Sequence, residues 1–145
     1  ACLVLKSGYS VKCGLFDLSD GKQVIDFRYD DITLLGFNRA LGKDGSRRYL
    51  LDTSTGDVIA SLPPNIGAAH FNETPVTWIF RAKSYYGIID EEGNILYEDA
   101  KDPLTGVTKF RHGFSGGQKD NKKWGILKSD GTWLVHPTYD YIKLL

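Results

Sequence analysis

Short runs of β-prone residues, separated by turns that contain glycine, dominate the hydrophobic pattern of the chain. Four blocks align without gaps, and in each an apolar pair precedes an aspartate or a lysine: residues 13–17, 48–52, 86–90 and 124–128. A turn glycine follows each block, at Gly21, Gly56, Gly93 and Gly131. Glycine tolerates the positive φ of a tight hairpin, so each block is predicted to form one strand of an antiparallel pair.

The blocks recur with a period of about 37 residues, which indicates an internal repeat. Returning strands are expected where Val, Ile, Leu and aromatic residues gather, at residues 22–27, 57–62, 94–97 and 132–136. Further strands are expected between the repeats, at residues 32–41, 77–82 and 107–111. No helix is predicted, because Gly or Pro interrupts the pattern every few residues. We therefore expect an all-β fold of four antiparallel β-meander repeats.

The fourth repeat has the most distinctive sequence. Residues 123–131 are Lys-Trp-Gly-Ile-Leu-Lys-Ser-Asp-Gly, and residues 136–140 are His-Pro-Thr-Tyr-Asp. This copy resembles the WG repeat of bacterial proteins. The third copy keeps residues 86–90 with Gly93, and the second copy diverges most. The first copy keeps Gly14, Asp17, Gly21, Tyr29 and Asp30. The resemblance implies an all-β repeat domain whose members share no catalytic residues and bind partners.

Glycine recurs inside the first strand of three repeats, at Gly14, Gly87 and Gly125. A glycine weakens a strand, so its recurrence suggests a close approach to the backbone. An aromatic ring is expected to cover the bare backbone, Tyr29 in the first copy and Tyr139 in the fourth. The alternative is that these glycines mark β-bulges.

A single repeat of two or three strands cannot bury a face and leaves unpaired strand edges. The repeats are therefore expected to pack against one another. Residues 1–5 correspond to the later part of a strand between repeats, and residues 141–145 correspond to the beginning of one. We therefore expect a single domain over residues 1–145 that is closed or nearly closed, as a small propeller-like ring or a barrel. An open, curled stack with charged edges is the alternative.

Charge and hydropathy narrow the classes of partner. The 145 residues carry 18 Lys+Arg and 18 Asp+Glu. Zero net charge argues against nucleic acid, because phosphate binding requires a surplus of cations. No apolar run approaches the roughly 18 residues of a membrane helix, and the first residues lack the pattern of a secretion signal. A cytoplasmic protein without a membrane partner is therefore expected.

The two cysteines do not form a disulfide framework or a zinc motif. If Ser7 and Gly8 form a two-residue hairpin loop, Cys2 lies opposite Cys13 with Cα atoms ~5.5 Å apart. In a reducing compartment, two thiols that pack as small hydrophobic groups are favoured over a bond.

A match to the nucleophile motif G-x-S-x-G occurs at residues 113–117, with His112 beside it. A small hydrolase that uses Ser115 as nucleophile with His112 is therefore the alternative to a binding protein. The motif works on a strand-to-helix elbow, whereas the sequence around it predicts strands. The three histidines show no metal-ligand spacing, so neither a metal nor another cofactor is expected.

One repeat position holds a carboxylate in three copies, at Asp17, Asp52 and Asp90. These residues suggest a ring of carboxylates, but Lys128 interrupts it. Aspartates beside tight turns usually accept backbone N–H bonds, so a structural role is favoured.

Positions that depart from the repeat are the best candidates for partner contacts, because features that the scaffold needs should recur. Aromatic and arginine side chains are enriched at binding hot spots, so the candidates are Arg47, Arg48, Trp78, Arg81, Tyr85 and Trp133. We predict a non-catalytic protein-binding module that acts as an inhibitor or scaffold of a bacterial protein. A small-molecule site at the ring's centre is a third interpretation, which requires a pocket of ~300 Å³ or more.

Overall fold

The computed structural model describes residues 2–6, 12–71 and 74–145, with residues 2–6 described through their backbone alone. Its regular elements are β-strands, and every paired strand is antiparallel to its neighbour. No helix among the described residues is long and apolar enough to cross a membrane. The all-β class predicted from the sequence is confirmed.

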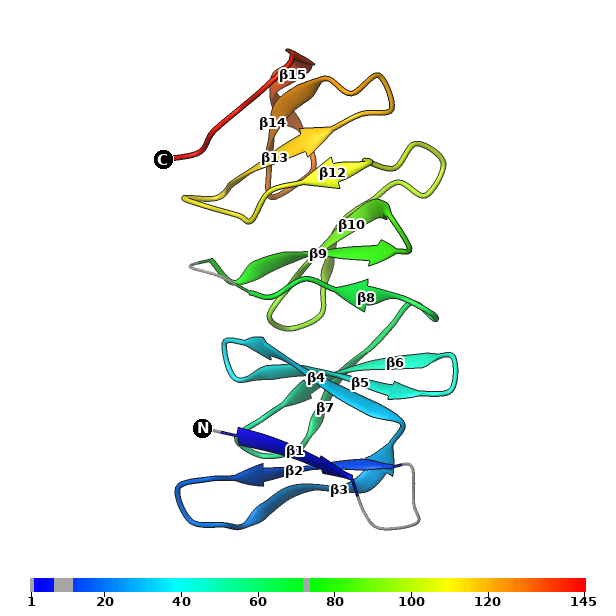
Figure 1. Ribbon diagram of the computed structural model, residues 1–145, viewed down its shortest axis with the longest axis vertical. Helices are drawn as coiled ribbons and strands as arrows, with labels where there is room; N and C mark the ends of the chain where they lie inside the picture. Colours follow the sequence, from blue (N-terminus) through cyan, green and yellow to red (C-terminus); the bar gives the residue numbers. More distant parts are fainter. Residues whose placement is uncertain (1, 7–11, 72–73) are drawn as a thin grey trace. The chain divides into compact units, whose positions relative to one another are not determined.

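Two compact units make up the chain, Ala1–Ile66 and Gly67–Leu145, and each contains two sheets (Figure 1). That the four repeats form one domain stays a prediction. In the first unit, the N-terminal sheet has the order β1-β2-β3 and the second sheet has the order β4-β5-β6-β7. Their strands are β1 (Cys2–Lys6), β2 (Cys13–Asp17), β3 (Gln23–Tyr29), β4 (Asp31–Gly36), β5 (Arg39–Asp44), β6 (Arg47–Asp52) and β7 (Val58–Leu62).

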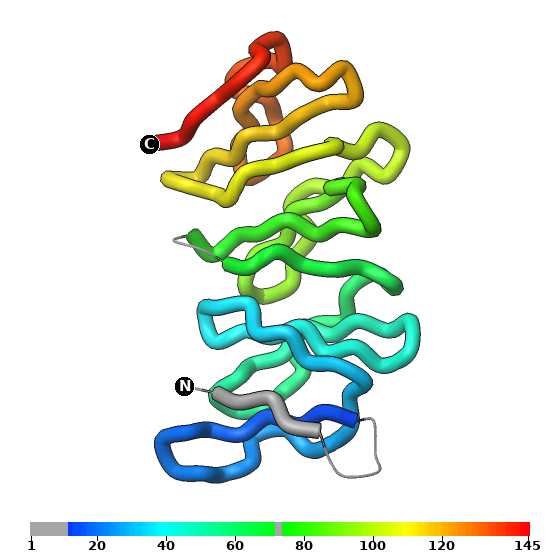
Figure 2. The backbone as a smooth tube through the Cα atoms, viewed as in Figure 1, coloured from blue at the N-terminus to red at the C-terminus, as the bar shows by residue number. Residues whose placement is uncertain are grey.

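The second unit repeats this plan. The third sheet has the order β11-β10-β9-β8, and the C-terminal sheet has the order β12-β13-β14-β15. Its strands are β8 (Gly67–Ala68), β9 (Val76–Arg81), β10 (Ser84–Asp90), β11 (Ile95–Glu98), β12 (Gly106–Val107), β13 (Phe114–Gln118), β14 (Trp124–Lys128) and β15 (Trp133–Tyr139). Figure 2 shows how the chain runs back and forth within each sheet as a meander.

The repeat predicted from the sequence is present in the strands. The four blocks lie in β2, β6, β10 and β14, and each is followed by a hairpin to β3, β7, β11 and β15. None of the sheets closes on itself among the described strands, and each four-stranded meander resembles one propeller blade. Closure of the sheets into a ring stays a prediction.

Three expected strands differ from the structure. The strand expected at residues 32–41 is a hairpin of β4 and β5, because Phe37 and Asn38 adopt positive φ between them. Of residues 107–111, only Val107 belongs to a strand, and β13 follows the turn at His112. Residues 141–145 form no strand, since no described strand pairs with them.

Two of the recurrent strand glycines, Gly14 and Gly125, lie opposite β-bulges of the returning strand, and the expected cover by Tyr29 and Tyr139 is wrong there because neither ring is among the nearest neighbours of a methyl group at these positions. A methyl group on Gly14 would lie 2.8 Å from the carbonyl oxygen of Ile25 on the returning strand. A methyl group on Gly125 would collide with the carbonyl oxygen of Val135. The strand register shifts at both places. The returning backbone, rather than a tyrosine ring, therefore requires glycine here.

The cysteine register also differs from the expectation. Cys2 lies opposite Asp17, and Cys13 lies opposite Lys6. The Ser7-Gly8 loop on which the expected pairing rested lies outside the described residues. Cys13 is a free, buried thiol, and its sulfur lies 3.6 Å from the carbonyl oxygen of Asp30.

Each unit has a hydrophobic core between its two sheets. In the first unit, Leu15 and Tyr29 of the N-terminal sheet pack with Ala40 and Leu51 of the second sheet. In the second unit the core contains Trp78, Ile88, Leu104, Phe110 and Leu127. One face of each sheet is therefore built to receive the next sheet of the same unit.

Candidate functional site

Ser115, the predicted nucleophile of the hydrolase alternative, lies in the core of the second unit. Its side chain is 0% exposed. The indole Nε1 of Trp78 donates a hydrogen bond of 2.9 Å to Ser115 Oγ, and Ser115 Oγ lies 2.8 Å from the carbonyl oxygen of Thr108. These contacts describe a hydroxyl that satisfies a buried indole N–H.

His112 does not activate this serine. It is exposed in the turn before β13, with a φ of 53°. Within residues 12–71 and 74–145, the hydrogen-bond partners of Ser115 are Trp78, Thr108 and Gly116, and none is a histidine. The motif runs into strand β13 rather than onto a strand-to-helix elbow.

The repeated aspartates stabilise turns, as the sequence predicts. Asp17 Oδ1 accepts hydrogen bonds from the hydroxyl and the backbone N–H of Ser19, at 2.7 and 2.8 Å. Asp52 is held in the same way by Ser54. The Ser19 hydrogen bonds lower the pKa of Asp17 below its ordinary value. Asp90 accepts backbone hydrogen bonds in the third copy.

Of the predicted partner-binding residues, Arg47 and Arg48 belong to the first unit. Arg47 is exposed. Arg48 is half-buried: its Nε donates to the carbonyl oxygen of Ile66 at 2.8 Å, and its Nη1 donates to that of Gly45 at 2.8 Å. Arg48 therefore ties the β5–β6 turn to the end of the unit.

The other four candidates belong to the second unit. Trp78 is only 1% exposed, while Tyr85 and Trp133 are partly buried against the same core. Arg81 is exposed and lies over the ring of Tyr86, 5.2 Å from its centroid. The structure thus divides the six residues between two units and gives the side chains of five of them packing or hydrogen-bonding contacts. Partner binding by them stays a prediction.

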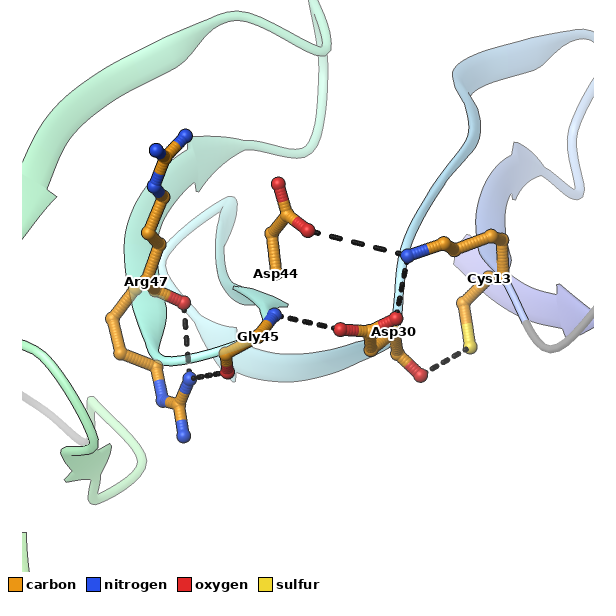
Figure 3. A network of polar contacts seen from close by, with 7 residues as sticks. Cys13, Asp30, Asp44, Gly45 and Arg47 are labelled. Carbon is orange, nitrogen blue, oxygen red and sulfur yellow. Dashed lines mark hydrogen bonds and ion pairs between the residues drawn. The ribbon is translucent and has the colours of Figure 1, made fainter.

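A polar clamp joins the two sheets of the first unit. Lys12 Nζ donates to Asp30 Oδ1 at 2.6 Å, and the N–H of Gly45 donates to Asp30 Oδ2 at 2.7 Å. Figure 3 shows Asp30 between the turn at Gly45 and the strand at Cys13. The hydrogen bonds from Lys12 and Gly45 lower the pKa of Asp30. One carboxylate therefore connects its own sheet to the β5–β6 turn of the next sheet.

The second unit contains a corresponding clamp. Asp102, which follows β11, accepts a hydrogen bond of 2.7 Å from Lys119 Nζ in the turn between β13 and β14. One repeat later, Asp140 forms an ion pair with Lys123 of its own sheet, and the Asp140 side chain is 85% exposed. Within residues 12–71 and 74–145, no turn of another sheet donates to Asp140.

Comparison with known families identifies this last copy. Residues 124–144 match the WG containing repeat. The resemblance expected from the sequence is confirmed over these residues, and the meanders of the other sheets are consistent with further copies. No curated protein matches the chain.

Two computationally designed proteins of known crystal structure have a similar fold. Ika8 has 11% sequence identity and a TM-score of 0.54 over 88% of this chain and 45% of Ika8. Ika4 has 16% identity and a TM-score of 0.52 over 86% of this chain and 84% of Ika4. BamB from Moraxella catarrhalis, at 16% identity and a TM-score of 0.48, is covered over 38% of its length by 90% of this chain. The designed proteins show a shared fold alone.

The WG-containing repeat exposes an apolar surface that sequence reasoning missed. We call it the C-terminal face, and its residues are Ile126, Leu134, Val135, Tyr139, Tyr141 and Leu145. Tyr139 is 56% exposed and Leu145 is 86% exposed. Two grooves of about 210 and 310 Å³ lie on this face and share Ile126.

Proposed function

We propose that the protein is a non-catalytic protein-binding module, which acts as an inhibitor or scaffold of a bacterial protein. The observation that carries this proposal is the C-terminal face, where tyrosine and leucine side chains stand in solvent around two grooves. Exposed apolar patches of this kind mark interaction sites, and tyrosine is enriched among binding hot spots.

The chemistry of the face favours a protein over a small ligand. Apolar side chains supply most of both grooves, and the charged or polar lining residues are the exposed Arg111, His112 and Lys143. A small-molecule pocket requires polar groups that converge inside it. A mainly apolar, open surface that carries tyrosine and arginine is instead typical of a protein interface.

The proposal takes the C-terminal face as open, so it does not include closure of the four sheets into a ring within one chain, which would cover this face. It does include the compartment predicted from the sequence. A cytoplasmic location fits the free, buried thiol of Cys13.

Capture of a partner by the immobilised chain tests this proposal. The tail variant combines Tyr139→Ser with Leu145→Asp and changes the C-terminal face; Ile95→Ser changes an exposed apolar residue of the third sheet as a control. A protein that binds the wild type and the control, but not the tail variant, supports the proposal. Equal capture by all three chains, or capture by none, contradicts it.

A further inference from the structure

The C-terminal face repeats a surface that is buried inside the first unit. Residues 29–35 are Tyr-Asp-Asp-Ile-Thr-Leu-Leu, and residues 139–145 are Tyr-Asp-Tyr-Ile-Lys-Leu-Leu. Tyr29 is 2% exposed in the first copy, whereas its counterpart Tyr139 is 56% exposed. Leu35 is 1% exposed, whereas Leu145 is 86% exposed. The two segments share five of their seven residues, and the equivalent tyrosine and leucine side chains are covered in one copy and uncovered in the other.

A β-sheet provides the cover in the first unit. The strand that begins after Tyr29 is β4, which pairs with β5 of the second sheet. A methyl group on Gly42 of β5 would lie 2.9 Å from the Tyr29 ring, so the ring lies directly over this strand. Leu51 of β6 packs in the same cluster. The surface is thus shaped to receive a sheet that offers the counterparts of β5 and β6.

The polar groups lead to the same conclusion. Asp30 and Asp102 each bind a turn between the middle strands of the next sheet. Asp140 holds the same repeat position and keeps the ion pair with Lys123 that corresponds to Lys12–Asp30. What Asp140 lacks, over the described residues, is a turn of a following sheet. The C-terminal sheet is therefore one half of a repeat junction.

The N-terminal sheet offers the other half. Its strands β1, β2 and β3 correspond to β5, β6 and β7, and β1 pairs with β2 alone among the described strands. A counterpart of β4 is absent from this sheet as described. Phe16 occupies the position of the buried Leu51 and is only half-buried, with the Phe27 ring 6.0 Å away. This sheet has both an open edge and an apolar outer face.

We propose that the C-terminal face of one copy docks on the N-terminal sheet of a second copy. Residues 141–145 add to β1 as β4 adds to β5, and Tyr139 lies over β1 as Tyr29 lies over β5. Gly42 lies opposite Tyr49, and Leu5 lies opposite Gly14 at the same repeat position, so Leu5 is the counterpart of Gly42. Ile32 pairs with Gly42, and Ile142 is the counterpart of Ile32. In the proposed contact, Ile142 therefore lies opposite Leu5. The inference rests on the proposed binding function of this face and names its partner.

A second copy of the chain supplies the N-terminal sheet that this contact requires. Each chain carries one copy of both surfaces, so two head-to-tail contacts close a dimer. The zero net charge of the chain imposes no overall repulsion between copies.

Sedimentation velocity of the full chain, from about 1 µM to 1 mM, tests the proposal. The wild type is expected to double its mass with concentration. The tail variant and the N-face variant, Phe16→Ser with Phe27→Ser, should each raise the dimer dissociation constant at least ~10-fold. The control Leu18→Ser, at an exposed position in the turn between β2 and β3, should dimerise like the wild type.

Mixing the two variants decides between arrangements. The tail variant keeps an intact N-terminal sheet and the N-face variant keeps an intact C-terminal face, so their mixture forms a heterodimer through one contact. Circular dichroism confirms that each variant is folded. Dimerisation of the N-face variant by itself would mean that C-terminal faces pair with each other, and would overturn the proposal.

A wild type that stays monomeric at about 1 mM also overturns the proposal. A monomer is the result expected if the C-terminal face docks on the N-terminal sheet of its own chain. The proposed binding of another protein and the proposed self-association can fail independently of each other. If a monomeric wild type captures another protein and the tail variant does not, the face binds a partner but not a second copy. If the wild type dimerises as proposed but captures nothing else, self-association is the function of the face.

Discussion

The buried hydrogen bond between Trp78 and Ser115 gives a quantitative test of the second unit and of its serine. The change is Ser115→Ala, which removes the hydroxyl that accepts the indole N–H at 2.9 Å. Trp78 is 1% exposed, so water does not replace the lost acceptor. An unsatisfied buried donor costs about 1–3 kcal/mol. Since whole domains have about 5–15 kcal/mol of stability, this loss is easily measured.

Urea denaturation followed by tryptophan fluorescence measures the effect. We expect Ser115→Ala to lower the free energy of unfolding by about 2 kcal/mol. Ser84→Ala, at an exposed serine of β10, is the matched control and should stay within about 0.5 kcal/mol of the wild type.

A double-mutant cycle isolates the hydrogen bond itself. Trp78→Phe removes the donor, and combining it with Ser115→Ala should cost less than the sum of the single changes by about 1 kcal/mol. Trp124 and Trp133 remain as fluorescent probes. If Ser115→Ala matches Ser84→Ala in stability, the structural role assigned to this hydroxyl is wrong. If Ser115→Ala also abolishes a hydrolytic activity, the hydrolase interpretation replaces the structural one.

Three further changes test the repeat positions, each by urea denaturation. Gly14→Ala should destabilise the chain by about 1–3 kcal/mol, because its methyl group would meet the carbonyl oxygen of Ile25; an unchanged midpoint would contradict the bulge. Arg48→Ala should cost about 1–3 kcal/mol by leaving carbonyl oxygens without their donor, and wild-type stability would refute the tie to Ile66. The lowered pKa of Asp30 means that its contribution is present above pH ~4 and is lost as the pH falls through the lowered value, so Asp30→Asn should destabilise at pH 7 and progressively less in acid. An equal difference at both pH values would contradict this linkage.

The sequence predicts the hairpins well because their signals are local. A turn glycine with positive φ and an aspartate that accepts neighbouring N–H groups determine each turn without help from distant residues, as Gly21 and Asp17 show. The copies therefore agree with the expected strands β2, β6, β10 and β14 and with the hairpins that follow them.

Elements without such signals are missed. Strand β13 is rich in glycine and resembles a loop in sequence, yet Gly117 is buried where a methyl group would collide with Leu127. The turn between β4 and β5 uses positive φ at Phe37 and Asn38, with no glycine at either position. Here tertiary packing, rather than local propensity, determines the conformation.

The repeat also changes how a functional residue can be recognised. Arg48 and Trp78 are two of the residues predicted to bind a partner, and in the structure their side chains serve the scaffold of their own units. The C-terminal face differs from the equivalent surface of the first copy in burial rather than in residue type. Tyr139 keeps the residue type of Tyr29 and loses only its cover. Because identical side chains have the same tendency to leave water, an uncovered copy of a buried surface is a candidate binding face. In a repeat protein, equivalent positions should therefore be compared by exposure before they are compared by sequence.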